Sequence, residues 1–191
     1  MASSTKARRD WIGSAIDQYQ GRLIRFASRI TGDVESARDV VQDTFFRLCR
    51  EDLDLIRDHL PAWLFRVCRN RALDVRKKEG PLQALDDDGI SALEEPGAGP
   101  HARLEQDDDA RRVRAALGGL PAGQQEVLRL RFQEELSYKE ISGVTGHSIG
   151  SVGFLIHDGI KKLRARLRPE EPARRPEGDS LPLFTTRAQI A

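Results

Sequence analysis

Aromatic residues are scarce in this chain, at 6% of 191 residues, and only two cysteines are present. Few aromatics, with proline and glycine clustered away from the apolar runs, make a poor composition for a many-stranded sheet but suit short helix bundles. Neither cysteine has a Cys or His neighbour at metal-ligand spacing. We therefore expect an all-α fold with two buried, reduced thiols at Cys49 and Cys68, and no metal or other cofactor.

Long apolar runs are also missing. No stretch approaches the roughly 18 apolar residues that a membrane span needs. The first residues, MASSTKARRDW, have no apolar segment behind their basic ones. These absences predict a cytoplasmic protein. A length of 191 residues allows two small domains, each with a small hydrophobic core.

Charge is segregated along the chain, although the formal net charge is only +1. Residues 1–80 hold 16 basic and 12 acidic residues, residues 81–110 hold 1 and 9, and residues 111–168 hold 11 and 5. Two basic blocks thus flank an acidic one. This suits two polyanion-binding modules joined by a segment that does not bind the same polyanion, although an ordinary solvated surface would give the same pattern.

Apolar positions at three-to-four spacing predict three helices in the first half of the chain. The first begins at Trp11 and ends at Gly32, and Asp33 can cap the second, whose polar side holds acidic and amide residues. Pro61 suits the first turn of the third helix, which has a basic face. Residues 79–108 lack periodicity and hold four glycines and three prolines, which predicts a flexible acidic linker.

A different signal marks the second half. Ser137 and Glu140 have the spacing of a capping box, so a helix begins at Ser137. Gly146 ends this helix after about two turns, and Ser148 can cap a longer one. Two helices joined in this way are typical of a helix-turn-helix, whose second helix enters the DNA major groove. The basic end of the second helix could contact phosphates or be only a solvated helix end.

The predicted organisation is thus a helical domain at 11–78, the linker at 79–108, a helix-turn-helix domain at 109–168 and a disordered tail at 169–191. The tail is rich in proline and charge. Its one apolar patch, LPLF at 181–184, could dock on this chain or on a partner.

Three segments resemble one protein family, in the same order and with matching separations. They are SRITGDVESARDVVQDTFFRL at 28–48, PAWLFRVCRNRALDVRKK at 61–78 and LPAGQQEVLRLRFQEELSYKEISGVTGHSIGSV at 120–152. The family is the extracytoplasmic-function (ECF) group of bacterial RNA polymerase sigma factors. The resemblance implies a protein that is not an enzyme, binds core RNA polymerase, recognises the minus-thirty-five and minus-ten elements of promoter DNA and promotes melting.

The resemblance also implies roles for individual residues. The polymerase would be bound by Asp39, Gln42, Asp43, Phe45 and Arg47. The melted non-template strand at minus ten would be captured by Trp63, Arg66, Arg69, Asn70, Arg76, Lys77 and Lys78. The duplex minus-thirty-five element would be read by Ser137, Ser148, Ser151, Leu155, His157, Lys161 and Lys162. An anti-sigma factor is implied as a further partner, without direct membrane insertion of this chain.

The second half departs from the family at the early turns of the recognition helix, where members often carry Lys or Arg. Gly153, Phe154, Leu155 and Asp158 stand there instead, so base readout would rest more on serine, histidine and DNA shape. Two other functions stay open. A stand-alone helix-turn-helix regulator would explain only residues 110–168. An enzyme has little support, because the four histidines are scattered and no nucleophile stands with a plausible base.

Overall fold

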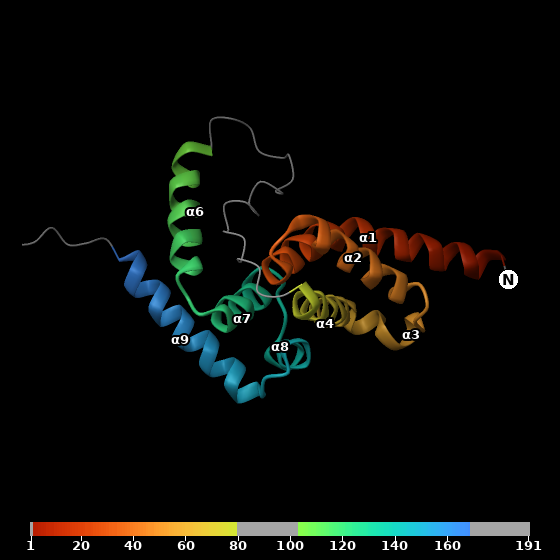
Figure 1. Cartoon of the computed structure of the whole chain (residues 1–191). Helices are drawn as coiled ribbons and strands as arrows, with labels where there is room; N and C mark the ends of the chain where they lie inside the picture. The colour runs from red at the N-terminus through yellow and green to blue at the C-terminus, as the bar shows by residue number, and fades with distance from the viewer. Residues whose placement is uncertain (1, 80–102, 169–191) are drawn as a thin grey trace, which may run out of the picture.

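The structure is a computed structural model that describes residues 2–79 and 103–168, with side chains described for 6–78 and 109–168. Every regular element in these ranges is a helix (Figure 1), which confirms the all-α prediction. The LPLF patch at 181–184 and most of the expected linker lie outside the described residues.

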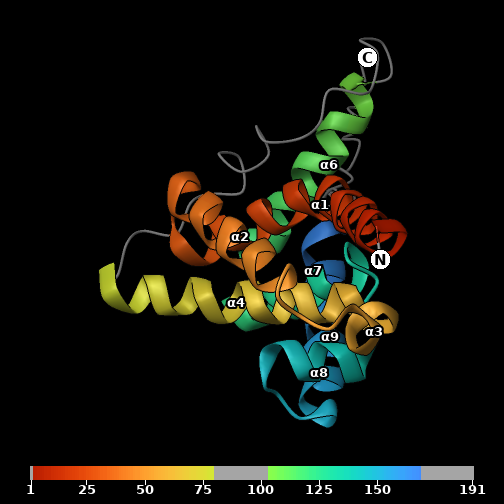
Figure 2. The same ribbon diagram turned by 90° about the vertical axis from the view of Figure 1, so that its right-hand side faces the viewer.

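The first helical group contains α1 (Ala2–Thr31), α2 (Val34–Leu48), the short α3 (Leu53–Ile56), the 3-10 turn η1 (Arg57–His59) and α4 (Leu60–Glu79). The three long helices pack against one another in pairs (Figures 1 and 2). Gly32 separates α1 from α2 with a φ of 89°, in the left-handed region that glycine adopts without strain. Asp33 caps α2 as predicted, because its carboxylate accepts a hydrogen bond of 2.7 Å from the Ser36 amide.

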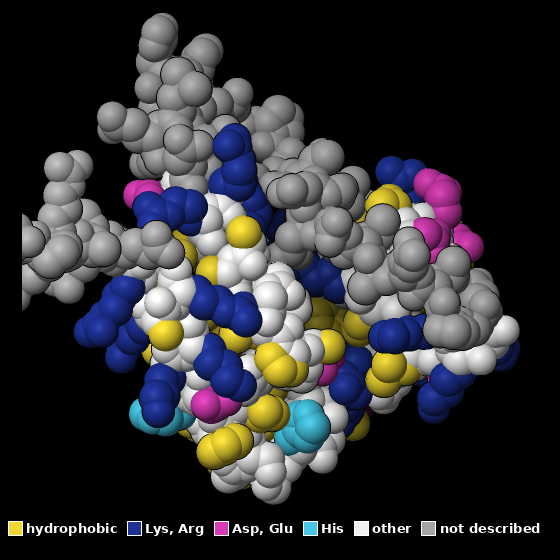
Figure 3. Space-filling view, turned by 60° about the vertical axis from the view of Figure 1, so that its left-hand side comes forward, with side chains coloured by type: hydrophobic (Ala, Val, Ile, Leu, Met, Phe, Trp, Pro, Cys, Tyr) yellow, Lys and Arg dark blue, Asp and Glu magenta, His cyan; other side chains and the backbone are white. Residues whose placement is uncertain are grey.

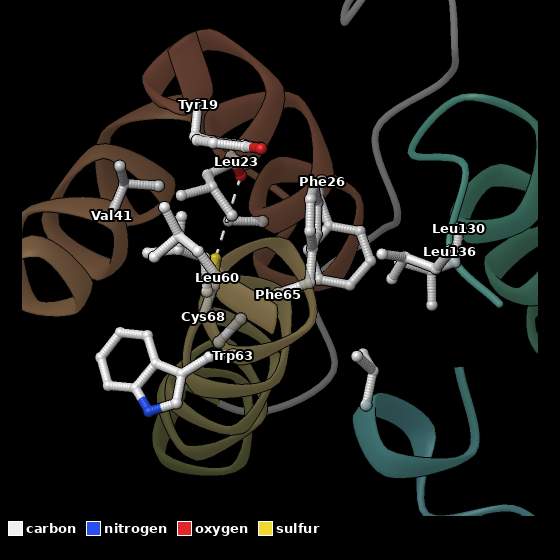
Figure 4. Packing of buried hydrophobic residues seen from close by; sticks show 14 of the residues in the cluster. Tyr19, Leu23, Phe26, Val41, Leu60, Trp63, Phe65, Cys68, Leu130 and Leu136 are labelled. Atoms are coloured by element: carbon white, nitrogen blue, oxygen red, sulfur yellow. Dashed lines mark hydrogen bonds between the residues drawn. The ribbon is translucent and has the colours of Figure 1, made fainter. Parts of the chain in front are cut away.

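The centre of this group is an apolar core. Phe26 of α1 and Phe65 of α4 meet edge to face, with ring centroids 5.1 Å apart and ring planes at 88°. Beside them the Cys68 thiol lies 4.0 Å from the carbonyl oxygen of Leu23 (Figure 4). Burial raises the pKa of the Cys68 thiol to about 12, so this cysteine is a core residue and not a reactive one.

The second helical group contains α6 (Arg103–Gly118), α7 (Ala122–Phe132), α8 (Tyr138–Thr145) and α9 (Ile149–Leu167), and α9 packs against the other three. The predicted capping box is confirmed. The Ser137 hydroxyl accepts from the Glu140 amide at 3.3 Å, and the Glu140 carboxylate accepts from the Ser137 amide at 2.8 Å. Gly146 ends α8 at a φ of 79°, and Ser148 caps α9 by accepting from the Ser151 amide at 3.1 Å.

The crossing of α7 and α9 depends on a glycine. Gly159 is buried in α9, and a Cβ atom there would lie 2.9 Å from Cδ1 of Leu128 on α7. Such a distance is shorter than van der Waals contact, so the absence of a side chain lets the two helices approach. This close approach fixes α9 across α7.

The two helical groups pack on each other in one continuous apolar cluster. Figures 1 and 2 both show α8 lying against α4, and these helices contact each other extensively. In Figure 4, Leu130 and Leu136 extend from the second group toward Phe26 and Phe65. Two groups that the sequence predicts as separate domains therefore share a buried interface.

Local expectations need correction at three places. The first helix begins at Ala2 and not at Trp11. Helix α6 begins at Arg103, inside the stretch expected to be linker. Cys49, predicted to be buried, is exposed, because it follows the last residue of α2 as its C-cap and leaves the helix face that packs on α1 and α4.

Candidate nucleic-acid and polymerase interfaces

The outer face of α2 carries the side chains predicted to bind polymerase. Asp39, Gln42 and Arg47 are exposed. Asp43 is half-buried because its carboxylate accepts a hydrogen bond of 2.7 Å from Nε of Arg71 on α4. This ion pair holds the carboxylate at the α2–α4 junction with one side open to a partner.

Phe45 does not belong to that face. Its side chain is 8% exposed and packs in the core, whereas the next residue, Phe46, is 58% exposed. One residue along a helix turns the side chain by about 100°, so the apolar contact expected from Phe45 is available only from Phe46. The sequence shows two adjacent phenylalanines, and only the packing of α2 decides which of the two rings points into the core.

The basic face of α4 is partly open and partly covered. Arg66 and Asn70 are exposed, as are Arg76, Lys77 and Lys78 near the end of the helix. Arg69 forms a paired contact with Glu126 of α7, Nε donating at 2.7 Å and Nη2 at 3.2 Å. Both side chains are 18% exposed. Arg69, which was predicted to contact DNA, is therefore already paired with a carboxylate of the same protein.

Trp63 is also withdrawn from solvent. It is 6% exposed, which corrects the expectation of a free stacking platform. Together with Arg66, it lines a cleft whose opposite wall is formed by Ser137, Lys139 and Glu140 at the start of α8. In this arrangement the indole offers little surface on which a nucleic-acid base could stack.

The recognition helix α9 presents an exposed stripe that is apolar at its start and basic at its end. The stripe consists of Gly150, Phe154, His157, Lys161, Arg164 and Arg168. Phe154 is 68% exposed, whereas Leu155, the residue predicted to contact DNA, is half-buried against the core. The large side chains exposed on the early turns are therefore those of Ile149 and Phe154, whereas Leu155 packs against the core.

The polar residues predicted for α9 take different roles. Ser148 and Ser151 are joined to each other, with hydroxyl oxygens 2.8 Å apart, and remain exposed. Lys162 pairs with Asp158 at 2.8 Å. Hydrogen bonds from Lys162 and then from Gln124 hold the pKa of Asp158 below its usual range. His157 and Lys161 are exposed, and Ser137 lies at the start of α8 as its cap.

The outer face of the second helical group bears many Lys and Arg side chains among few acidic ones (Figure 3). A cationic surface of this kind attracts the phosphates of duplex DNA. Within the described residues, no cluster of three or more His, Cys, Asp or Glu side chains could hold a metal ion. None of the helices described is both long and apolar enough to cross a membrane.

Comparison with known proteins decides the family. Residues 15–81 match Sigma-70 region 2, and residues 110–163 match Sigma-70 region 4. The ECF RNA polymerase sigma factor EcfG of Rhodopseudomonas palustris (strain TIE-1) is 31% identical over 166 residues, which cover 85% of this chain and 86% of that one. The chain belongs to the ECF RNA polymerase sigma factors. SigW of Bacillus subtilis (strain 168) is 26% identical over 85% of this chain and 92% of its own.

A solved structure agrees with this assignment. CnrH, in complex with the cytosolic domain of CnrY, is 27% identical, with a TM-score of 0.52 over 86% of this chain and 92% of that one. As a sigma factor, the chain binds core RNA polymerase, recognises promoter DNA at the minus-thirty-five and minus-ten elements and promotes melting. A stand-alone helix-turn-helix regulator is not favoured, because it leaves the match over 15–81 unexplained.

Proposed function

We propose that this sigma factor divides promoter recognition among three surfaces: the outer face of α2 for polymerase, the basic face of α4 for the melted strand, and the exposed stripe of α9 for duplex DNA. The observation that carries this proposal is the α9 stripe. It projects from a capped helix-turn-helix, and its distal half holds Lys161, Arg164 and Arg168. A helix of this kind fits the major groove, with its early turns at the base edges and its cations at phosphates.

Phe154 gives the early turns an apolar contact in place of a cation. An apolar side chain in the major groove reads the C5-methyl group of thymine. Gly150 has no side chain and no neighbouring side chain within 4 Å of where a Cβ would be, so the helix backbone can approach the groove floor there. The proposed readout at minus thirty-five therefore depends on Phe154 and shape, with the hydroxyls of Ser148 and Ser151 and the His157 imidazole beside them.

Two substitutions on α9 test this assignment by duplex binding of the isolated sigma factor and by run-off transcription with core polymerase. Lys161→Ala should weaken binding to about the same extent for all DNA sequences. It should also reduce by about 1 the steepness with which the logarithm of the binding constant falls with the logarithm of the salt concentration. Phe154→Ala should reduce the discrimination at the thymine it contacts, where a mismatched base pair typically costs about 1–3 kcal/mol, and change little at other positions. If both variants change all sequences equally, Phe154 does not read a base.

On α4 we propose that Arg66, Asn70 and the 76–78 run hold the melted non-template strand. Cations that track phosphates, next to surfaces on which bases stack, are what single-strand binding requires. Extruding a base from the duplex costs a few kcal/mol, and contacts made only with unpaired bases can offset it. These residues should therefore act after the initial closed complex has formed.

The expected bounds were 11–78 and 109–168, and since α1 begins at Ala2, α4 ends at Glu79 and α6 begins at Arg103, the units that we propose are 2–79 and 103–168, with 80–102 as the connection and 169–191 as a tail. A connection of this length would span at most roughly 80 Å if it were extended. That reach would let the two units engage separate promoter elements on one DNA molecule.

We further propose cytoplasmic action and control by a partner protein of the anti-sigma type. The complex of CnrH with the cytosolic domain of CnrY supports such a partner. Truncation after Arg168 tests the alternative, that the tail itself inhibits. In a purified transcription system without other regulators, a more active truncated protein would indicate an inhibitory tail. Equal activity of the truncated and full-length proteins there would exclude an inhibitory tail.

A further inference from the structure

Helices α1, α4 and α7 meet near the centre of Figure 1, and with the turn before α9 they line a cavity of about 300 Å³. This volume is at the lower end of the range of about 300–1,000 Å³ that is typical of small-molecule sites. The promoter contacts proposed above use one residue of its wall, Arg76, and leave its interior without a role. The size of the cavity limits an occupant to one small molecule.

The wall of the cavity has an apolar part and a cationic part. The apolar part comes from α1 and α4, through Phe26, Ile30 and Leu73. The cationic part consists of four arginines, Arg29, Arg69, Arg76 and Arg129. Among the described residues that line the cavity, Glu126 is the one acidic side chain, and it is paired with Arg69. Four arginines and one glutamate leave a formal charge of +3 on the wall.

Two of these arginines are fixed by neighbouring side chains. Arg69 is held by both carboxylate oxygens of Glu126. Arg129 is only 6% exposed, and its Nη1 donates to the side-chain oxygen of Gln125 at 2.9 Å. The amide nitrogen of Gln125 donates in turn to the Leu120 carbonyl at 2.8 Å. A cationic wall that is already ordered costs less conformational entropy when a ligand binds.

A neighbouring cavity of about 610 Å³ differs in its charge balance. Its described lining contains three arginines and also three acidic residues. Arg22 and Glu134 in that lining form an ion pair at 2.6 Å. Its positive charge is therefore balanced within the protein, whereas the smaller cavity keeps an excess of positive charge for a ligand to balance.

The two parts of the smaller cavity define the chemistry of its ligand. A phosphate monoester carries about −1.5 to −2 charges at pH 7, and guanidinium groups bind phosphate oxygens in pairs. The half-buried side chains of Ile30 and Leu73 offer an apolar surface to a ring system beside that phosphate. We propose that this cavity binds a free nucleoside monophosphate, with the phosphate at the arginines and the base at the apolar part.

Equilibrium dialysis of the full-length protein against AMP and GMP tests the site, with adenosine and inorganic phosphate as the two halves of a ligand. Because each half lacks the contacts of the other, AMP should bind at least about tenfold more tightly than either half. Binding of phosphate as tight as that of AMP would mean that the site takes an anion alone, and the proposal would be wrong. It would also be wrong if neither AMP nor GMP bound.

Filling the cavity locates the bound nucleotide. Gly123 of α7 lines the cavity, and a Cβ atom there would have no neighbour within 4 Å, so Gly123→Leu places a side chain in open space. Gly118 is an exposed helical glycine with equally open space that does not line the cavity, so Gly118→Leu is the matched control. Gly123→Leu should weaken AMP binding by about tenfold or more, because the new side chain occupies the ligand's space. Gly118→Leu should bind as wild type does.

Thermal melting gives an independent measurement of the same variants. A ligand that binds only the folded protein raises its melting temperature. AMP should therefore raise the melting temperature of wild type and Gly118→Leu, but not that of Gly123→Leu. Circular dichroism checks that both variants keep their helices. Equal AMP binding by the two leucine variants would exclude this cavity as the site.

The charge of the wall is tested at its exposed edge. Arg76→Met removes a lining guanidinium, and Lys77→Met makes the same change in net charge at the next exposed residue, outside the lining. Loss of a hydrogen bond to a charged group should weaken AMP binding by about tenfold in Arg76→Met. Lys77→Met should change it little. Equal weakening would indicate general attraction to a basic surface and would contradict a defined site.

A single-stranded oligonucleotide distinguishes a free nucleotide from a nucleotide of the melted strand. A fluorescent strand of about 15 nucleotides is within the site sizes usual for single-strand binders. Its affinity should be the same for Gly123→Leu and Gly118→Leu, because the cavity takes a separate small molecule. If Gly123→Leu weakens strand binding as much as AMP binding, the cavity belongs to the strand surface and the free-ligand proposal is overturned. Absence of transcription by the wild-type protein with core polymerase would instead contradict the proposed function and leave the AMP measurements unaffected.

Discussion

The close approach of α7 and α9 at Gly159 makes a quantitative prediction about the helix that is proposed to read DNA. Replacing a helical glycine by alanine stabilises a helix by up to about 1 kcal/mol when the new methyl group meets nothing. Gly150, near the start of α9, is such a position, since no neighbour lies within 4 Å. We expect Gly150→Ala to raise the free energy of unfolding by about 0.5–1 kcal/mol.

Gly159→Ala gains the same helix propensity but must displace Leu128, whose Cδ1 would be 2.9 Å from the new Cβ. Overpacking of a well-packed core typically costs about 1–3 kcal/mol. Gly159→Ala should therefore leave the free energy of unfolding between unchanged and about 2 kcal/mol lower, on combining these two terms. The difference between the two alanine variants, about 1–3 kcal/mol, isolates the packing cost.

Urea unfolding followed by circular dichroism measures both variants. The double variant Gly159→Ala with Leu128→Ala provides the decisive comparison. Leu128→Ala alone should cost about 2–5 kcal/mol, but in its background Gly159→Ala should become stabilising because the methyl group has room. Equal stabilisation by Gly150→Ala and Gly159→Ala, or additive effects of Gly159→Ala and Leu128→Ala, would refute the close approach.

Three further predictions concern other surfaces. Iodoacetamide at pH 8 should label exposed Cys49 and spare Cys68 until the protein unfolds, because burial raises the pKa of Cys68 to about 12; simultaneous labelling seen by mass spectrometry would contradict this core. Phe46→Ala should weaken core-polymerase binding without loss of thermal stability, whereas Phe45→Ala should lower the free energy of unfolding by about 3–5 kcal/mol; the reverse pattern in pull-down and melting experiments would mean that the rings are misassigned. Asn70→Ala should reduce permanganate reactivity of promoter thymines more than filter binding of the closed complex, and equal loss in both assays would argue against a role after melting.

Local sequence determined the regular elements of this protein well. The Ser137 capping box, the Gly146 turn and the Ser148 cap each depend on groups within a few residues, so their positions could be predicted from spacing alone. The same is true of the Gly32 turn before α2. Three separated motifs then indicated the ECF sigma family, and the family matches confirmed it. The start of α1 was missed because residues 2–10 carry no apolar stripe.

The orientation of individual side chains was decided by tertiary packing. Phe45 and Phe46 are adjacent and chemically identical, and only the position of α2 against α1 and α4 buries the first and exposes the second. Leu155 and Phe154 divide in the same way on α9. A helical pattern defines a stripe to within about one residue in sequence, which corresponds to about 100° around the axis, and this is too coarse to choose between neighbours.

The sequence by itself determined an all-helical sigma factor with a helix-turn-helix and a basic α4, because these features arise from local periodicity, caps and motif order. Only the tertiary structure decided that Arg69 would be held by Glu126 and Arg22 by Glu134. Ion pairs between residues so far apart in the chain depend on how two surfaces meet. Their formation balances desolvation against attraction, and no local pattern records that balance.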